Sequence, residues 1–373
     1  MTKKPSYRFV VYTEPWEQRK LGDVSTITMG QSPNSENYTD NPNDSILVQG
    51  NADMKNGRVF PRVWTTQITK QARQGDLILS VRAPVGDIGK TDYDVVLGRG
   101  VASIDGNEFL YQALSQMKQN GYWSKLSTGS TFESINSNDI KSAIISLPSL
   151  PEQTAIGSFF QDIDQLISLQ QRKLEVLKEQ KKTYLKLLFP SKGQTKPALR
   201  FAGFEDEWKE VKLGEIADYK NGKGYEDRQS DSGSYELINL NSISIDGGLK
   251  RSGKFIDKAD ETLEKGDLVM VLSDVAHGNL LGRVAIIPES NKFVLNQRVA
   301  LLRPRLNSNS EFLYSYINSN QYYFKAQGAG MSQLNISRSS VENFSVYFPS
   351  LPEQEVIGSF FQDLDKAIAK QEE

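Results

Sequence analysis

The amino-acid sequence contains one seventeen-residue phrase twice. PSLPEQTAIGSFFQDID begins at Pro148, PSLPEQEVIGSFFQDLD begins at Pro349, and fourteen of the seventeen positions are identical. Self-similarity at a spacing of about half the chain indicates two copies of one structural unit. We therefore expect the chain to fold as two related halves.

The duplication extends to the start of each half. Seven residues recur at a shift of 192, namely Pro5, Arg8, Phe9, Trp16, Lys20, Leu21 and Gly22, which are matched by Pro197, Arg200, Phe201, Trp208, Lys212, Leu213 and Gly214. Between these ends the halves share only a Gly-Asp-Leu step and a Val-Leu…Val-Ala step. A length of 373 residues also suits two domains of roughly 150 residues. We predict variable domains at 1–148 and 193–349, a helical spacer at 149–192, and a short helix at 350–373.

Composition excludes several classes of protein. No stretch approaches the roughly 20 apolar residues that cross a bilayer, and the basic N-terminus runs into no apolar segment of a signal peptide. The sequence has no cysteine, which excludes disulfides and thiolate metal sites and fits a reducing compartment. We expect a cytoplasmic protein without membrane contact. The net charge of −2 does not indicate a nucleic-acid binder, so such a role must depend on local charge.

Apolar spacing predicts one long helix from about residue 151 to about residue 189. Pro151 and Glu152 suit its first turn, and Pro190 ends it. Such a helix is roughly 57 Å long at 1.5 Å per residue. Its heptad seam is Ile156, Phe160, Ile163, Ile167, Gln170, Leu174, Leu177, Lys181, Tyr184 and Leu188. The second copy offers a partner seam in register, formed by Ile357, Phe361, Leu364 and Ile368.

The two inserts have the pattern of mixed α and β structure. We expect strands at 76–81 and 268–272, helices at 108–119 and 310–318, and hairpin turns at Asn56-Gly57 and at Asp246-Gly247-Gly248. The predicted fold class is therefore α+β, with two tandem mixed α/β domains, long helices packed as an antiparallel coiled coil, and a pseudo-twofold repeat.

A basic stretch runs from Arg172 to Arg200. Its nine cations are Arg172, Lys173, Lys178, Lys181, Lys182, Lys186, Lys192, Lys196 and Arg200. A solvated helix face is the first interpretation, and phosphate contact is the alternative. The carboxylates Asp162, Asp164, Asp363 and Asp365 beside the seam are interpreted as a solvated face as well.

The search for catalytic motifs is negative. The single histidine, His277, excludes His-pair metal sites, and no phosphate-binding GxxxxGK[ST] loop or dinucleotide GxGxxG motif occurs. The sequence also has no NPPY-type methyltransferase tetrapeptide and no nuclease carboxylate-lysine cluster. We predict a binding protein without catalytic residues and without a metal or cofactor of its own.

A family resemblance is carried by the WxxxKLG[DE][VI] openings at Trp16 and Trp208, the duplicated LPEQxxIGxFFxxxD helix start, and the RKLEVLKEQKKTYLKLLF helix. The chain resembles the specificity subunit of a type I restriction-modification system along its whole length. The runs SVRAPVGDIG and LGRGVASI also resemble one type of target recognition domain.

This resemblance implies that each domain reads one half of a bipartite duplex DNA target. It also implies that the helices pair antiparallel, separate the domains and dock modification subunits, two per chain, and that restriction subunits join the complex. S-adenosylmethionine, ATP and magnesium would then belong to the partner subunits. Two tandem domains related by an approximate twofold axis match the local dyad of duplex DNA. Because the two halves differ in sequence, the expected target is asymmetric, with the helices setting the spacing of its halves.

Residues that suit base or phosphate contact lie near the variable loops. In the first insert these are Arg58, Arg82, Arg99, Thr128, Ser130 and Thr131, and in the second they are Arg228, Arg251, His277, Arg283, Ser332 and Gln333. Arg suits guanine and Gln suits adenine, each pair being worth about 1 to 3 kcal/mol of discrimination. A phosphate contact or a structural role is the alternative for each.

The predicted partner helix has four seam positions against ten in the central helix. We therefore hypothesise that the seam from Leu174 to Leu188 is unpaired within the chain and is covered by a modification subunit or another copy; a truncated chain is the alternative. Two rival functions stay open, namely a helical scaffold that never reads DNA and a single-chain restriction-modification enzyme. The DNA target and its spacer length do not follow from the sequence.

Overall fold

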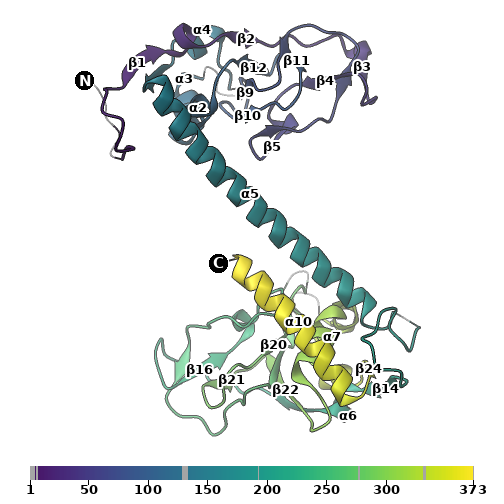
Figure 1. Ribbon diagram of the computed structural model, residues 1–373. Coiled ribbons are helices and arrows are strands. Elements are labelled where there is room, and N and C mark those ends of the chain that lie inside the picture. Colours follow the sequence, from purple (N-terminus) through teal and green to yellow (C-terminus); the bar gives the residue numbers. More distant parts are fainter. Residues whose placement is uncertain are drawn as a thin grey trace. The chain divides into compact units, whose positions relative to one another are not determined.

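The computed structural model (Figure 1) describes residues 5, 7–127, 133–191, 193–275, 278–330 and 333–372. The chain divides into two units, residues 1–169 and residues 170–373, and the division falls inside the long helix α5 (Leu150–Leu187). The predicted Thr128, Ser130, Thr131, His277 and Ser332 lie outside the described residues.

Unit 1 is built on two sheets. The first has the strand order β2-β12-β9-β10-β6-β5, and the second has the order β3-β7-β4-β11-β8. A two-stranded pair, β1 with β13, joins the two ends of the repeat. The strands are β1 (Glu17–Lys20), β2 (Ile27–Met29), β3 (Tyr38–Thr39), β4 (Ser45–Val48), β5 (Met54–Lys55), β6 (Arg58–Val59), β7 (Trp64–Thr65), β8 (Gln71–Ala72), β9 (Leu77–Ser80), β10 (Ile88–Lys90), β11 (Val95–Leu97), β12 (Val101–Ile104) and β13 (Ile144–Leu147). The helices are α1 (Leu21–Val24), η1 (Ser35–Asn37), η2 (Asn51–Asp53), α2 (Glu108–Gln119), α3 (Tyr122–Leu126), α4 (Ser137–Lys141) and the first part of α5.

Unit 2 has sheets with the orders β15-β22-β18-β20 and β17-β16-β21, with β14-β24 and β19-β23 as two-stranded pairs. The strands are β14 (Lys209–Lys212), β15 (Ala217–Asn221), β16 (Tyr235–Ile238), β17 (Phe255–Ile256), β18 (Leu268–Val271), β19 (Ser273–Val275), β20 (Val284–Ile286), β21 (Phe293–Leu295), β22 (Val299–Pro304), β23 (Gln333–Asn335) and β24 (Ser345–Phe348). The helices are the second part of α5, α6 (Leu213–Ile216), η3 (Leu240–Ser242), α7 (Ser310–Ser319), α8 (Gln321–Gln327), α9 (Arg338–Glu342) and α10 (Leu351–Glu372).

The two inserts share one topology despite their divergent sequences. In unit 1, β12 lies between β2 and β9, and in unit 2, β22 lies between β15 and β18, all antiparallel. The pairs β4-β11 and β16-β21 are both parallel. All residues of the central strands β9 and β18 are buried, which explains their continuous apolar runs. The predicted α+β class and the tandem repeat are therefore confirmed, and the sequence comparison alone missed the common scaffold of the inserts.

The duplicated LPEQ motif fixes how each long helix begins. Glu152 is 0% exposed and accepts bidentate hydrogen bonds from Arg8 at 2.5 and 2.6 Å. Glu353 is 1% exposed and accepts the same pair from Arg200 at 2.6 and 2.7 Å. The hydrogen bond to its carboxylate partner raises the pKa of each arginine. The sequence predicted a helix-dipole role for Glu152 but not this buried ion pair.

Within unit 2, α10 packs antiparallel against the C-terminal part of α5. The Tyr184 and Phe360 rings lie 5.1 Å apart, and Lys181 Nζ lies 2.5 Å from Asp365 Oδ1. Lys178 Nζ lies 2.6 Å from Glu372, close to the end of α10. Figure 1 shows α10 in yellow beside this part of α5. The predicted antiparallel pairing of the two seams is confirmed here.

The hypothesis of an unpaired seam from Leu174 to Leu188 is wrong for its C-terminal part. Leu188 is buried at 2% exposure, and Tyr184 packs on Phe360. The exposed part of the seam lies instead on the first half of α5, where Phe160 and Ile167 are 40% and 50% exposed. The short partner helix covers the end of the seam nearest its own unit because the helix-start ion pair and the aromatic core fix it there.

The close approach of each long helix to its insert gives a first prediction. A Cβ at Gly358 would lie 2.9 Å from Phe312 N and 2.6 Å from Asn309 Oδ1, and a Cβ at Gly157 would lie 2.8 Å from Glu108 Cβ. Gly358→Ala should therefore lower the free energy of unfolding by about 1 to 3 kcal/mol. Helix propensity alone predicts the opposite sign. Chemical denaturation measures the change, with Ser359→Ala at the neighbouring exposed position as the control. A stabilised Gly358→Ala protein would contradict the close packing.

The buried ion pair gives a second prediction. Arg200→Met leaves the Glu353 carboxylate buried without its partner and should cost about 2 to 3 kcal/mol of stability. The cost stays below that of a fully buried pair because the arginine side chain keeps 17% of its surface exposed. Arg200→Met, Glu353→Gln and the double variant form a double-mutant cycle with the unchanged chain. Thermal unfolding measures the stability of each. Strictly additive losses would show that the two side chains do not interact.

Candidate nucleic-acid interface

A polar hollow of about 480 Å³ in unit 1 brings together two of the predicted residues, Arg82 and Arg99. This surface, called the arginine hollow below, is lined by Ser32, Pro33, Ser35, Tyr38, Gln49, Gly50, Asn51, Ser80, Arg82, Ala83, Arg99 and Gly100. Both arginines are exposed, and neither forms an ion pair within the described ranges. Unpaired guanidinium groups beside amide and hydroxyl side chains can contact base edges and phosphates.

Local backbone structure positions the two arginines. Ser80 Oγ donates to the carbonyl of Arg82, and Arg82 forms an antiparallel bridge with Ser134. Arg99 stands at the turn between β11 and β12, where its N–H donates to Ser32 Oγ. A Cβ at Gly100 would lie 2.0 Å from the Gln49 carbonyl, so only glycine fits at this turn. The arginines therefore project from an ordered sheet edge.

Asp53 holds the wall of the arginine hollow that Gln49 and Gly50 form. Its side chain is buried, and Oδ2 accepts the N–H groups of Gln49 at 2.7 Å and Gly50 at 3.3 Å. Arg62 Nε lies 3.3 Å from Oδ1 of the same carboxylate. In unit 2, Ser242 Oγ accepts the N–H of Asn239 in the same role. This contact could not be predicted from the sequence, since Asp53 is one acidic residue in a polar loop.

Unit 2 presents the equivalent sheet edge with different side chains. The N–H of Val81 donates to the Gly100 carbonyl, and the N–H of Leu272 donates to the Arg298 carbonyl, both at 2.9 Å. Arg82 bridges Ser134 as Ser273 bridges Asn335, so Ser273 occupies the position of Arg82. By the same alignment Gln297 stands where unit 1 has Arg99.

The predicted Gln333 lies at this edge of unit 2 and donates from Nε2 to Ser273 Oγ at 2.5 Å. Arg298, which the sequence analysis missed, is exposed there with a left-handed φ of 67°. Gln297, also missed, donates to Glu226. The structural match of the two units, rather than any motif, identifies these residues.

Other predicted residues lie away from the two sheet edges or are held by other groups. Arg58 lies on β6 and pairs with Asp92 at 2.5 Å, outside the arginine hollow. Arg283 is half-buried and donates to the Asn318 carbonyl at 3.1 Å, and burial lowers its pKa. Arg228 lies over the Tyr225 ring at 5.1 Å. Arg251 is exposed in the loop before β17.

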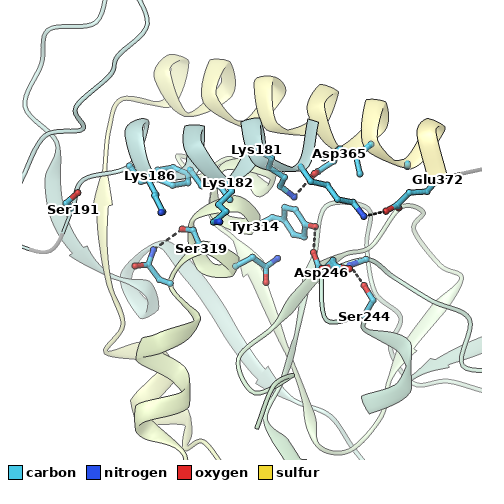
Figure 2. A pocket seen from close by; sticks show the side chains of 18 of the residues that line it. Lys181, Lys182, Lys186, Ser191, Ser244, Asp246, Tyr314, Ser319, Asp365 and Glu372 are labelled. Atoms are coloured by element: carbon cyan, nitrogen blue, oxygen red, sulfur yellow. Dashed lines mark hydrogen bonds and ion pairs between the residues drawn. The ribbon is translucent and has the colours of Figure 1, made fainter. Parts of the chain in front are cut away.

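Part of the basic stretch on α5 is neutralised by ion pairs. A hollow of about 980 Å³ in unit 2 is lined by Lys178, Lys181, Lys182 and Lys186 together with Asp246, Asp365 and Glu372. Figure 2 shows this hollow from close by. Lys181 pairs with Asp365 and Lys178 pairs with Glu372, as the dashed lines show. The interpretation of Asp365 as a solvated face is therefore wrong, because it bridges two helices. Two of the lysines that line this hollow are thereby neutralised, whereas Lys186 forms no ion pair with a described residue.

Within the part of the chain that the structure describes, no group of three or more His, Asp or Glu side chains is placed to hold a metal ion. In the same residues no helix is both long and apolar enough to cross a membrane.

Asp53→Ala tests how the arginine hollow is held. Removing the carboxylate leaves the Gln49 and Gly50 N–H groups without their acceptor and should cost about 1 to 2 kcal/mol. Amide hydrogen exchange at these two positions should become faster, while the exposed control Asp40→Ala should leave both rates unchanged. If the exchange rates of these two amides were the same in Asp53→Ala as in the unchanged chain, the carboxylate would not order this wall.

Comparison with known proteins agrees with the duplicated architecture. The family model described as "Type I restriction modification DNA specificity domain" matches residues 13–179 and again residues 205–373. The chain is 34% identical over 191 residues to the putative type I restriction enzyme MjaX specificity subunit of Methanocaldococcus jannaschii, covering 49% of this chain and 44% of that protein. It is 24% identical over 243 residues to the MjaVIII specificity subunit of the same organism, covering 60% and 56%. The chain thus spans about half the length of these curated relatives.

The fold is similar to that of the crystal structure of the type I restriction-modification system S subunit from M. genitalium. The TM-score is 0.66 at 17% sequence identity, and the match covers 96% of this chain and 91% of that chain.

Proposed function

Because the chain belongs to the type I restriction-modification DNA specificity family, we propose that it reads a DNA sequence for a restriction-modification complex. Each unit recognises one half of a bipartite target in double-stranded DNA. The family match to both halves supports one recognition domain per unit.

The observation that carries the proposal is the equivalent sheet edge with different side chains in the two units. The first edge offers the exposed Arg82 and Arg99. At the matching positions the second edge has Ser273, which is buried at 2% exposure, and the exposed Gln297. A common scaffold holds both edges in the same way, while the exposed side chains decide which bases are favoured. Arg favours guanine and Gln favours adenine. The two half-sites therefore differ, and the target is asymmetric.

The long helices set the spacing of the half-sites and dock two modification subunits, and restriction subunits complete the complex. In this proposal the chain is not itself catalytic. Methylation and ATP-driven cleavage take place in the partners, which bind S-adenosylmethionine, ATP and magnesium. The complex works on DNA in the cytoplasm.

Two other functions make different predictions. A helical scaffold that never reads DNA predicts that exchanging one insert leaves the modified sequence unchanged. A single-chain restriction-modification enzyme predicts methylation without a modification subunit. The exposed, unpaired arginines of the arginine hollow favour DNA reading over a scaffold.

Arg82→Ala tests base reading directly. Single-molecule methylation mapping in cells that carry the chain and its modification subunit should give a split motif that disappears without the chain. In Arg82→Ala, discrimination should fall by about 1 to 3 kcal/mol at positions of one half-site only. Arg73→Ala, an exposed arginine outside the arginine hollow, is the matched control. An unchanged motif in Arg82→Ala would remove that residue from base reading, and no motif in the intact complex would contradict the proposed function.

A further inference from the structure

An aromatic side chain completes the helix contact of unit 2. Phe189, which follows the end of α5, packs against Phe312, Tyr316 and Phe361, with ring centroids at 5.7, 5.0 and 5.6 Å. Phe189 is 4% exposed and Phe361 is fully buried. The residue that follows the end of α5 thus packs between the first turns of α10 and helix α7 of the insert.

The internal repeat identifies the residues of unit 1 that correspond to Phe312, Tyr316 and Phe361, the three contacts of Phe189. Gly157 faces Phe109 as Gly358 faces Phe312, and the Trp16–Phe109 and Trp208–Phe312 ring pairs correspond at 5.6 and 6.0 Å. The residues that match Phe312, Tyr316 and Phe361 are therefore Phe109, Ala113 and Phe160.

These three residues of unit 1 line a hollow of about 650 Å³, called the Phe160 hollow below. Its other lining residues include Trp16, Met117, Ile145 and Ile156. Phe160 is 40% exposed, whereas its counterpart Phe361 is 0% exposed. Among the described residues of unit 1, no side chain occupies the place of Phe189.

A second aromatic contact is also incomplete in unit 1. In unit 2, Phe360 is covered on one side by Phe201 at 5.7 Å and on another by Tyr184 at 5.1 Å. The matching Phe159 contacts Phe9 at 6.0 Å and remains 49% exposed. Phe159 therefore keeps the counterpart of the Phe201 contact, and among the described residues it has no counterpart of the Tyr184 contact.

Charge extends the match along the same helix face. Asp365 pairs with Lys181, one turn before Tyr184 on α5. The corresponding Asp164 of unit 1 is exposed and accepts a hydrogen bond from Gln112 only, within the described ranges. A partner helix for unit 1 should therefore carry a cation one turn before an aromatic residue.

We propose that the Phe160 hollow docks, in trans, the C-terminal end of a partner helix with the pattern Lys-x-x-Tyr-Leu-x-x-Leu-Phe. This is the pattern that Lys181 to Phe189 present to unit 2. The phenylalanine fills the Phe160 hollow, the tyrosine covers Phe159, and the lysine pairs with Asp164. The proposal does not depend on DNA reading.

A second copy of this chain is disfavoured as the partner. Its own Leu188 and Phe189 are 2% and 4% exposed, because its unit 2 already uses them. The docking helix must instead come from a segment whose Leu-Phe end is free.

A synthetic peptide with the sequence of residues 172–190 tests the proposal on the whole chain. Fluorescence anisotropy of the labelled peptide should show saturable binding. The peptide with Phe189→Ala should bind about 10-fold or more weakly, because it lacks the aromatic group that fills the Phe160 hollow. Failure of the unaltered peptide to bind would overturn the proposal.

Two chain variants locate the contact. Phe160→Asp places a charge in the Phe160 hollow, and Ala113→Trp fills it from within; both should weaken peptide binding at least 10-fold while the DNA motif read by the complex is unchanged. Leu306→Asp, at a position 98% exposed in unit 2, is the control. Thermal unfolding shows that each variant is folded. Full binding to folded Ala113→Trp, or self-association that Phe160→Asp abolishes, would overturn the assigned partner.

Discussion

The bidentate contact between an arginine and a buried glutamate is the interaction on which each unit depends. Glu152 and Glu353 are removed from water at the first turn of a long helix, and a desolvated carboxylate must be paired. Arg8 and Arg200 supply that charge from the segment that begins each repeat. The ion pair therefore ties the first segment of a unit to its last helix and fixes how that helix leaves the insert.

In both inserts the positions proposed to read DNA are separate from the buried strands of the core. Strands β9 and β18 are buried along their whole length and keep one topology, so their sequence is constrained by packing. Just beyond the ends of these strands, Arg82 is exposed where the other unit has the buried Ser273, and both units keep the same topology. One scaffold can thus carry different side chains at equivalent positions.

The two units differ most where the long helices meet. In unit 2 the residues at the end of α5 include the buried Phe189, and Lys181 pairs with Asp365, which neutralises part of the basic stretch. The equivalent place in unit 1 is the Phe160 hollow. The start of the long helix is therefore covered by Phe189 in unit 2, whereas the corresponding surface of unit 1 is exposed.

The sequence by itself determined the repeat, the long helix, its antiparallel partner and the hairpin at Asn56-Gly57, because these depend on local periodicity and on identity between the copies. Only the tertiary structure decided which polar side chains meet. Arg82 and Arg99 come together, and Arg58 is held by Asp92, through pairing of strands far apart in the chain. Likewise, whether the end of α5 was free or buried depended on the packing of Phe189 against α7 and α10. Such long-range contacts leave no periodic signal in the sequence.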